Sequence, residues 1–339
     1  MKPSILLIYT GGTIGMVEDT RSKSLKPFDF NQITDRIPEL KSFNVQLSSI
    51  SFDEPIDSSN MSPDVWIQLA KLIEKNYSKY DGFVILHGSD TMAFTASALS
   101  FMLENLSKPV VLTGSQLPMG IIRTDGKENL ITAIEIASKQ ENGKALVPEV
   151  CIYFEYQLYR GNRTHKFNSE HFQAFQSANY PVLAEAGVHI KFNKNAIQKT
   201  TNKKLKVHTK LDAGIAVLKL FPGINENAIN AVLKTKKLKA VILETFGSGN
   251  APTDKWFINL LKKTIARGII VYNITQCNSG AVEQGKYETS IQLKKIGVIG
   301  GADITYEAAV TKLMFLLAQN SSARKMQTSL SRSLRGELS

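Results

Sequence analysis

Three apolar segments in the first half of the chain each run into a short polar loop, and the three loops share one kind of chemistry. Thr13 follows the first segment, Ser89 and Asp90 follow the second, and Ser115 follows the third. In a parallel α/β sheet the carboxyl ends of such strands meet along one edge, where ligands bind. Hydroxyl groups, a carboxylate and backbone N–H groups at glycines are what nucleophilic acyl chemistry uses. The sequence therefore predicts that these four residues share a site.

Thr13 stands directly after Gly11 and Gly12, which let the backbone turn sharply and approach a ligand closely. A threonine hydroxyl becomes a good nucleophile only when a neighbouring group takes its proton. The other interpretation is a phosphate-binding loop in which Thr13 merely caps a helix. The glycine spacing matches neither a Walker loop nor a complete GxGxxG motif, so both interpretations stay open.

Ser89 and Asp90 stand at a turn from strand to helix, shortly after His87. A carboxylate at such a turn commonly caps the helix that follows. A hydroxyl beside a carboxylate also resembles half of a proton relay. We expect His87 to be a core histidine whose ring bonds to the backbone.

Lys166 ends the polar segment 159–166, where a lysine is ordinarily solvated. If it is instead desolvated beside an aspartate, it can move protons or activate a hydroxyl. Ser58 and Ser59 lie in the polar segment 57–61, which is typical of a surface turn.

Strand-like apolar runs alternate along the chain with segments of helical spacing, which implies crossover connections and a parallel sheet. We predict an α/β fold with a larger N-terminal, mainly parallel-sheet domain over residues 1–192, a basic linker over 193–212 and a smaller C-terminal parallel α/β domain over 213–339. The polar loop 16–27 is a candidate lid. Strands are expected at 5–9, 83–86, 109–112, 149–154, 214–220, 240–245 and 268–275, and helices at 64–77, 91–106, 125–139, 225–235, 254–267 and 306–319.

The composition, with 43% hydrophobic and 21% charged residues, is that of an ordinary globular protein. No apolar run approaches the ~20 residues that span a bilayer, and we expect no cleaved signal peptide. Cys151 and Cys277 lie in strand-like contexts and are expected to be buried free thiols, with neither a disulfide framework nor metal-ligand spacing. We therefore expect a cytoplasmic protein without a membrane partner.

The net charge of +11 raises the question of nucleic acid. Residues 191–210 hold seven lysines and no acidic residue, and the tail at 324–335 adds four more basic residues. Base-stacking aromatics normally interleave with the charge of a nucleic-acid patch, and Phe192 alone does not make one. We expect a solvated linker and a frayed end rather than a nucleic-acid site.

Five motifs, in order along the chain, resemble those of the bacterial-type L-asparaginases, particularly the cytoplasmic type I subgroup. The motifs are YTGGTIG at 9–15, HGSDTM at 87–92, TGSQ at 113–116, LYRGNR at 158–163 and GVIGGAD at 297–303. The resemblance runs from Ile8 to about Gln319. It implies hydrolysis of L-asparagine to L-aspartate and ammonia, without a cofactor or a metal. It also implies a homodimer or homotetramer, with sites completed across a subunit interface.

The resemblance assigns catalytic roles to residues already singled out. Thr13 falls on the primary nucleophile of the family. Ser89, Asp90 and Lys166 fall on its second catalytic set. The backbone N–H groups of Thr13 and Ser89 are the candidates for an oxyanion hole.

It assigns substrate contacts as well. Ser58 and Asp90 fall on the positions that hold the α-carboxylate and the α-ammonium group, and a fixed carboxylate is the natural partner of an ammonium. Ser59, Ser89 and Ser115 are further candidates for substrate binding. Asn250 falls on a residue that a neighbouring subunit donates.

Four positions depart from the family pattern. Ser89 stands where threonine is usual, so the hydroxyl is kept but the methyl group that restricts its rotamer is lost. Leu25 stands at the lid tyrosine of many members, so we do not expect a tyrosine to act on Thr13. At the second, activating asparagine site of some type I members, Glu244 stands where an arginine is expected and His165 where a threonine is expected, while Cys277 is kept. Because Glu244 reverses the charge offered to the carboxylate of the ligand, we expect no such activation.

Two other classes of function compete with a type I asparaginase. One is an asparaginase-like amidotransferase subunit acting on aminoacyl-tRNA, which the basic balance favours slightly. Such subunits have an added N-terminal domain, and we expect none here because the sequence begins at the first strand. The other is a non-enzymatic binder of nucleotides or amino acids, which leaves Ser89, Asp90 and Lys166 without a joint role. Release of ammonia from free asparagine separates the first from the last, and salt-dependent binding of tRNA identifies the amidotransferase subunit.

Overall fold

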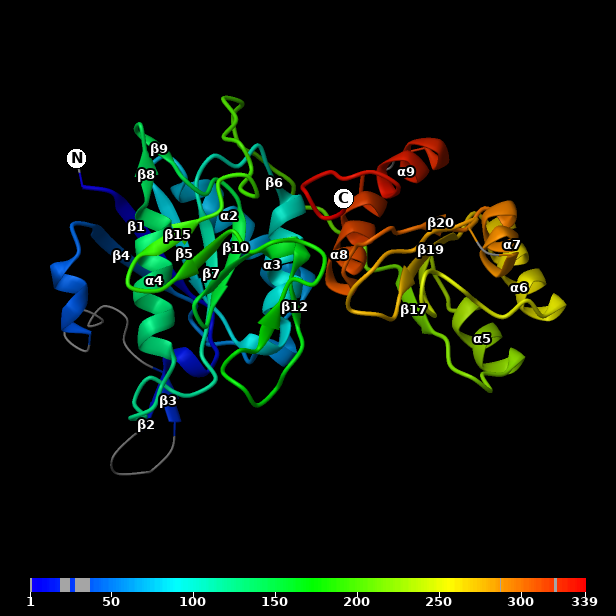
Figure 1. Cartoon of the computed structure of the whole chain (residues 1–339), viewed down its shortest axis with the longest axis horizontal. Helices are drawn as coiled ribbons and strands as arrows, with labels where there is room; N and C mark the ends of the chain where they lie inside the picture. The colour runs from blue at the N-terminus through cyan, green and yellow to red at the C-terminus, as the bar shows by residue number, and fades with distance from the viewer. Residues whose placement is uncertain (1, 19–24, 28–36, 287, 320–321) are drawn as a thin grey trace. The chain divides into compact units, whose positions relative to one another are not determined.

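The chain forms two compact units, Met1–Thr209 and Lys210–Ser339. The structure is a computed structural model that describes residues 2–18, 25–27, 37–286, 288–319 and 322–339. Each unit has its own sheet and its own helices (Figure 1). The predicted α/β class, with a larger N-terminal and a smaller C-terminal part, is confirmed.

The first unit is built on an eight-stranded sheet in the order β15-β14-β11-β10-β7-β5-β1-β4. Strands β10, β7, β5, β1 and β4 run parallel to one another, whereas β11, β14 and β15 each pair antiparallel with their neighbours. In chain order the strands are β1 (Ser4–Tyr9), β4 (Gln46–Ser51), β5 (Gly82–Leu86), β7 (Val110–Thr113), β10 (Val150–Phe154), β11 (Gln157–Arg160), β14 (Ala184–Ala186) and β15 (Ile190–Phe192).

The strand register places side chains of four strands in rows across the sheet. Leu7 of β1 pairs with Val84 of β5, Val84 pairs with Val111 of β7, and Val111 pairs with Cys151 of β10. All four residues belong to one buried cluster. Because alternate residues of a strand point to the same face, this row fixes which side chains reach each face of the sheet.

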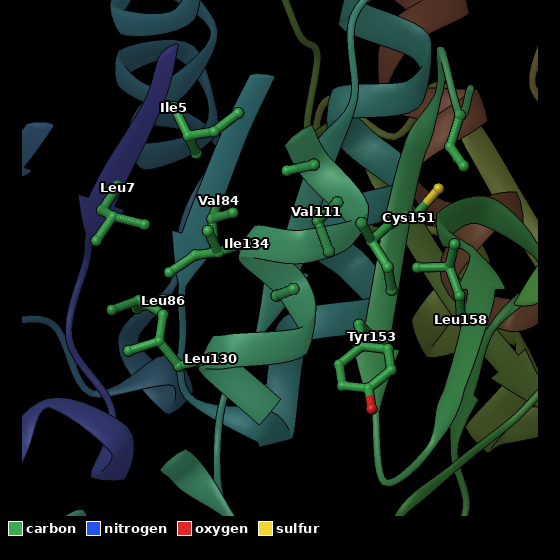
Figure 2. Close-up of a cluster of buried hydrophobic side chains, with 14 of the residues drawn as sticks. Ile5, Leu7, Val84, Leu86, Val111, Leu130, Ile134, Cys151, Tyr153 and Leu158 are labelled. Atoms are coloured by element: carbon green, nitrogen blue, oxygen red, sulfur yellow. The ribbon is translucent and has the colours of Figure 1, made fainter. Parts of the chain in front are cut away.

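Helix α4 (Gly126–Ser138) covers the face to which this row points. Figure 2 shows Leu130 and Ile134 of α4 lying against Leu86 and Val84 of the sheet. The ring of Phe83, which points to the opposite face, stacks on Tyr77 at 6.1 Å between centroids. Tyr77 directly follows α2 (Pro63–Asn76), and α2 contacts α3 (Met92–Met102). Helices therefore cover both faces of the parallel part of the sheet.

Two segments of the first unit differ from expectation. The helix predicted over 91–106 ends at Met102, because β6 (Leu103–Glu104) pairs with β16 (Lys206–Val207) and Asn105 turns the chain at φ 63°. Strand β16 lies within the segment expected to be a linker, and residues up to Thr209 belong to the first unit. Pairing with β6 attaches this basic segment to the first unit, while its seven lysines are exposed to solvent as expected.

The candidate lid includes a short hairpin. Strand β2 (Met16–Glu18) pairs antiparallel with β3 (Leu25–Pro27). Residues 19–24 of the lid lie outside the described residues, and Leu25 is described only through its strand pairing.

The second unit holds a four-stranded parallel sheet in the order β17-β18-β19-β20. Helices α7 and α9 were not expected from the sequence. The strands are β17 (Ile215–Lys219), β18 (Ala240–Thr245), β19 (Ile270–Thr275) and β20 (Ile299–Gly300), and the helices are α5 (Glu226–Leu233), α6 (Lys255–Ala266), α7 (Glu288–Ile296), α8 (Tyr306–Leu317) and α9 (Ala323–Leu330).

The expectation of a frayed C-terminus is wrong for residues 322–339. Lys312 of α8 and Glu337 form an ion pair of 2.7 Å with both side chains fully buried. The Lys312 ammonium also donates to the carbonyls of Leu330 and Arg332, at 3.2 and 2.8 Å. Burial lowers the pKa of Lys312, and the neighbouring Glu337 carboxylate opposes that shift. The ion pair therefore anchors the tail to the second unit.

The two cysteines have different environments. Cys151 is buried in β10 as expected, and burial raises the pKa of its thiol. Cys277 is exposed, which corrects the expectation of a buried thiol: it follows the end of β19, where its N–H donates to Thr275 Oγ1. Among the helices of the described residues, none has the length and apolar character to cross a bilayer.

Removal of one partner of the buried pair should destabilise the second unit. Glu337→Gln leaves the Lys312 ammonium buried without a counter-charge. We therefore expect the free energy of unfolding of the second unit to fall by about 3–5 kcal/mol. Urea unfolding in a Trp66→Phe background would measure this, because Trp256 of α6 is then the single fluorescent tryptophan.

The double variant Lys312→Met/Glu337→Gln should be less destabilised than Glu337→Gln alone, because it removes both charges. Asp212→Asn is the matched control at a more exposed ion pair with Lys239, where we expect a loss below about 1 kcal/mol. Equal losses in the single and double variants would contradict this account.

Candidate active site

The three polar loops begin side by side at one edge of the sheet. Tyr9 pairs with Leu86, and Leu86 pairs with Thr113, so the last residues of β1, β5 and β7 are neighbours. Beyond them, Thr10 donates to the Leu86 carbonyl through its N–H at 3.1 Å and its hydroxyl at 3.0 Å. The N–H of His87 donates to the Thr113 carbonyl at 2.9 Å. The predicted convergence of these three loops is therefore present.

Two glycines let the first loop approach its neighbours. Gly12 has φ 87°, and a Cβ atom on it would lie 2.4 Å from the backbone nitrogen of Gly88. A Cβ atom on Gly11 would lie 2.1 Å from the carbonyl oxygen of Ile56. Both contacts exclude a side chain, and both glycines, with φ 134° at Gly11 and 87° at Gly12, have backbone conformations that other residues rarely adopt. Thr13, which opens a 3-10 turn directly afterwards, is thereby held beside the loop of Ser89.

His87 is the buried core histidine that we expected. Its Nδ1 lies 2.6 Å from the carbonyl of Gly88, and its Nε2 lies 2.9 Å from Thr95 Oγ1. These partners fit a neutral ring that donates from Nδ1 and accepts at Nε2. Burial lowers the pKa of His87 to about 4. The ring is therefore neutral near pH 7 and supports the second loop structurally.

Ser89, Asp90 and Lys166 are brought together although 77 and 76 residues separate the serine and the aspartate from the lysine. The Lys166 ammonium donates to Ser89 Oγ at 2.9 Å and to Asp90 Oδ1 at 2.5 Å. Lys166 lies on β12 (His165–Lys166), which pairs with β13 (Phe175–Gln176). Its side chain is 14% exposed, so it is not an ordinary solvated lysine.

The charged groups of this cluster differ in their access to water. The Asp90 side chain is 65% exposed, whereas the ammonium of Lys166 is largely shielded. Asp90 is the N-cap residue of neither helical turn beside it, since those positions are held by Gly88 and Thr91. The open carboxylate is suited to a cationic ligand, and the shielded lysine is suited to proton exchange with the Ser89 hydroxyl.

Ser58 lies against the second loop, and Ser59 does not share its environment. Ser58 is buried, and its Oγ would lie 2.6 Å from a Cβ atom on Gly88. Its carbonyl accepts from Thr91 Oγ1 at 2.7 Å. Ser59 is exposed, and its N–H and hydroxyl both donate to Asp57 Oδ1 at 2.8 Å. These two bonds lower the pKa of Asp57. Both serines belong to a short turn, as the sequence indicated.

The third loop contributes a contact that the sequence does not predict. The hydroxyl of Ser115 donates to the Leu117 carbonyl at 2.7 Å and is thus engaged within its own loop. The neighbouring Gln116 reaches the cluster instead, since its Oε1 accepts from Ser89 Oγ at 3.3 Å. Gln116 belongs to the TGSQ motif, but its role depends on a contact across 27 residues that the motif does not specify.

Asn250 lies in the second unit, on the turn between β18 and α6. Its N–H donates to the Phe246 carbonyl at 2.8 Å, and its own carbonyl accepts from Phe246 at 2.9 Å. Gly247 and Gly249, at φ 47° and 103°, shape this turn. These backbone contacts of the Asn250 turn therefore lie within the second unit. Across the described part of the chain, no three histidine, cysteine, aspartate or glutamate side chains gather as a metal site would require.

Comparisons with known proteins agree over the whole chain. Residues 4–198 match the family description "Asparaginase, N-terminal", and residues 214–330 match "Glutaminase/Asparaginase C-terminal domain". L-asparaginase 1 of Escherichia coli is 42% identical over 348 aligned positions, which cover 99% of this chain and 98% of that protein. The crystal structure of L-asparaginase I from Vibrio cholerae has a TM-score of 0.91 and 40% identity, with both chains fully covered.

A more distant relative bears on the tRNA-dependent alternative. A glutamyl-tRNA(Gln) amidotransferase subunit of Pyrococcus abyssi is 30% identical over 99% of this chain, but the match covers 77% of that protein. The two domain matches, the 42% identity and the end-to-end structural similarity to L-asparaginase I agree with one another. The chain belongs to the asparaginase family, in its type I subgroup.

Proposed function

We propose that this protein hydrolyses the side-chain amide of L-asparagine to L-aspartate and ammonia, without a cofactor. Thr13 is the nucleophile, and Ser89, Asp90 and Lys166 form the second catalytic set. The observation that carries the proposal is the Lys166 ammonium within 2.9 Å of Ser89 Oγ and 2.5 Å of Asp90, next to the glycine loop of Thr13. A free asparagine assay with ammonia as the readout tests it, and the same assay with glutamine defines the preference between the two amides.

The proposed reaction has two steps. Thr13 Oγ1 attacks the amide carbon, a C–O bond forms, the C–N bond breaks, and ammonia leaves with the proton of the hydroxyl. Water then attacks the resulting ester, aspartate leaves, and Thr13 regains its proton. Lys166 and Ser89 assist proton movement, and the N–H groups of Thr13 and Ser89 stabilise the oxyanion.

Substrate recognition divides between opposite charges. The exposed Asp90 carboxylate binds the α-ammonium group, and the Ser58 and Ser59 turn binds the α-carboxylate. Ser115 contributes through the backbone of the third loop. Asn250 reaches the substrate from a neighbouring subunit of a homodimer or homotetramer, which we propose to be cytoplasmic.

Nucleic acid is a weaker candidate partner. Of the seven lysines in 191–210, Lys194 pairs with Glu141 at 2.5 Å and Lys206 lies 3.9 Å from Glu104. These acids neutralise part of the basic segment. A filter-binding titration with tRNA at two salt concentrations tests the alternative, because phosphate contacts weaken steeply as salt rises.

Loss of the Thr13 hydroxyl should abolish turnover. For Thr13→Ala we expect kcat to fall by about 10³-fold or more, because a nucleophile has no substitute in the first step. Ammonia release would be measured beside a circular dichroism spectrum that shows an intact fold. Thr13→Ser is the matched control, since it keeps the hydroxyl and should retain measurable activity. Near-normal ammonia release by Thr13→Ala would contradict the assignment of Thr13 as the nucleophile.

The second set should separate into catalysis and binding. Ser89→Ala and Lys166→Met should lower kcat by about 10²-fold or more with a smaller effect on KM, because they move protons. Asp90→Ala should also raise KM, because it removes the partner of the substrate ammonium. Steady-state kinetics with asparagine would measure both parameters. The division is wrong if all three variants change KM alike and leave kcat alone.

Complementation between inactive subunits should reveal the proposed role of Asn250. Thr13→Ala and Asn250→Ala subunits, expressed together, form hybrids in which one site carries both defects and another carries neither. Random pairing into dimers would restore about a quarter of the wild-type activity. The two variants expressed separately are the controls. Activity no higher than theirs, or full wild-type activity in a sample that light scattering identifies as monomeric, would refute the shared site.

A further inference from the structure

We propose that Gln116 is a positioning residue that holds the Ser89 hydroxyl and ties it to the segment 168–172. This inference rests on the proposed function, in which Ser89 belongs to the second catalytic set. The third loop contacts the cluster through Gln116, and this contact has no role in the proposed reaction as described above.

The amide of Gln116 has a single orientation that satisfies its neighbours. Nε2 donates to the carbonyls of His171 and Ser169, at 2.9 and 3.3 Å. Because both neighbours on that side are acceptors, the amide nitrogen must face them and Oε1 must face Ser89. Oε1 accepts the Ser89 hydroxyl proton at 3.3 Å.

The contacts make a directional chain through Ser89. Lys166 donates to Ser89 Oγ, Ser89 donates to Gln116, and Gln116 donates to two backbone carbonyls. Each hydroxyl or amide in such a chain has one defined role as donor and one as acceptor, and the bonds polarise one another. Because the Ser89 hydroxyl proton points toward Gln116, the lone pairs of Ser89 Oγ face Lys166.

Gln116 is itself held by a buried carboxylate. Asp125, which is 8% exposed, accepts the N–H of Gln116 at 2.9 Å and the N–H of Leu117 at 3.1 Å. Asn129 also donates to Asp125 at 3.2 Å and to the Gly114 carbonyl at 3.0 Å. The backbone on both sides of Gln116 is therefore fixed to the start of α4.

A hydrogen bond that fixes the hydroxyl matters more for a serine than for a threonine. Threonine restricts its own χ1 through its methyl group, whereas a serine hydroxyl selects among its rotamers through hydrogen bonds alone. Ser89 lacks that methyl group, and Gln116 supplies a second bond beside that of Lys166. The need for Gln116 should therefore depend on whether position 89 carries the methyl group.

A double-mutant cycle tests that dependence. Gln116→Met keeps the length of the side chain and removes its acceptor and donors. With Ser89 present we expect kcat to fall by about 10-fold or more with a smaller change in KM, and in the Ser89→Thr background by less than about 3-fold. Gln116→Ala serves the same cycle if Gln116→Met does not fold, as judged by circular dichroism.

The outcomes separate the inference from the proposed function. Equal losses in both backgrounds would mean that Gln116 acts only through the 168–172 segment, since threonine restores no bond to those carbonyls, and would overturn the inference. An inactive Ser89→Ala beside a fully active Gln116→Met would overturn it as well. A fully active Ser89→Ala would instead overturn the catalytic role of Ser89 on which it rests.

Discussion

The pairing of Tyr9 with Leu86 and of Leu86 with Thr113 is the constraint on which the site depends. It aligns the carboxyl ends of β1, β5 and β7, so their loops leave the sheet as neighbours. A slip of one residue would send the Val84 and Val111 side chains to the opposite face. The buried cluster beneath α4 makes that slip costly, and the core thereby sets where the polar loops begin.

Aligned strand ends bring the loops near one another, and glycines, which have no side chain, allow the close final spacing. Gly12 and Gly88 meet so closely that a Cβ atom on Gly12 would lie 2.4 Å from a backbone nitrogen. A Cβ atom on Gly88 would in turn lie 2.6 Å from Ser58 Oγ. The loops of Thr13 and Ser89 thus pack backbone against backbone, and the loop of Ser89 packs its backbone against the Ser58 side chain, which leaves little room for the three to move apart.

The sequence predicts the continuous apolar strands and the long amphipathic helices well, because burial leaves a periodic pattern. It does not predict β4, whose side chains are all partly or fully exposed, or the short antiparallel strands β14 and β15. Candidate site residues at strand ends, such as Thr13 and Ser89, follow from the same pattern. Gln116 and the buried pair of Lys312 with Glu337 do not, because each depends on a contact that the tertiary fold creates.

The unequal exposure of Asp90 and Lys166 links recognition to chemistry in the proposed reaction. An α-ammonium group that binds the open Asp90 carboxylate competes with Lys166 for the same negative charge. Its arrival therefore weakens the contact between Asp90 and Lys166 and leaves Ser89 as the remaining partner of the lysine. Ser89 is in turn held by Gln116, so the hydroxyl stays in position while the charges around it rearrange. A ligand without an ammonium group would leave Lys166 paired with Asp90, which makes selection of an amino acid part of the catalytic arrangement itself.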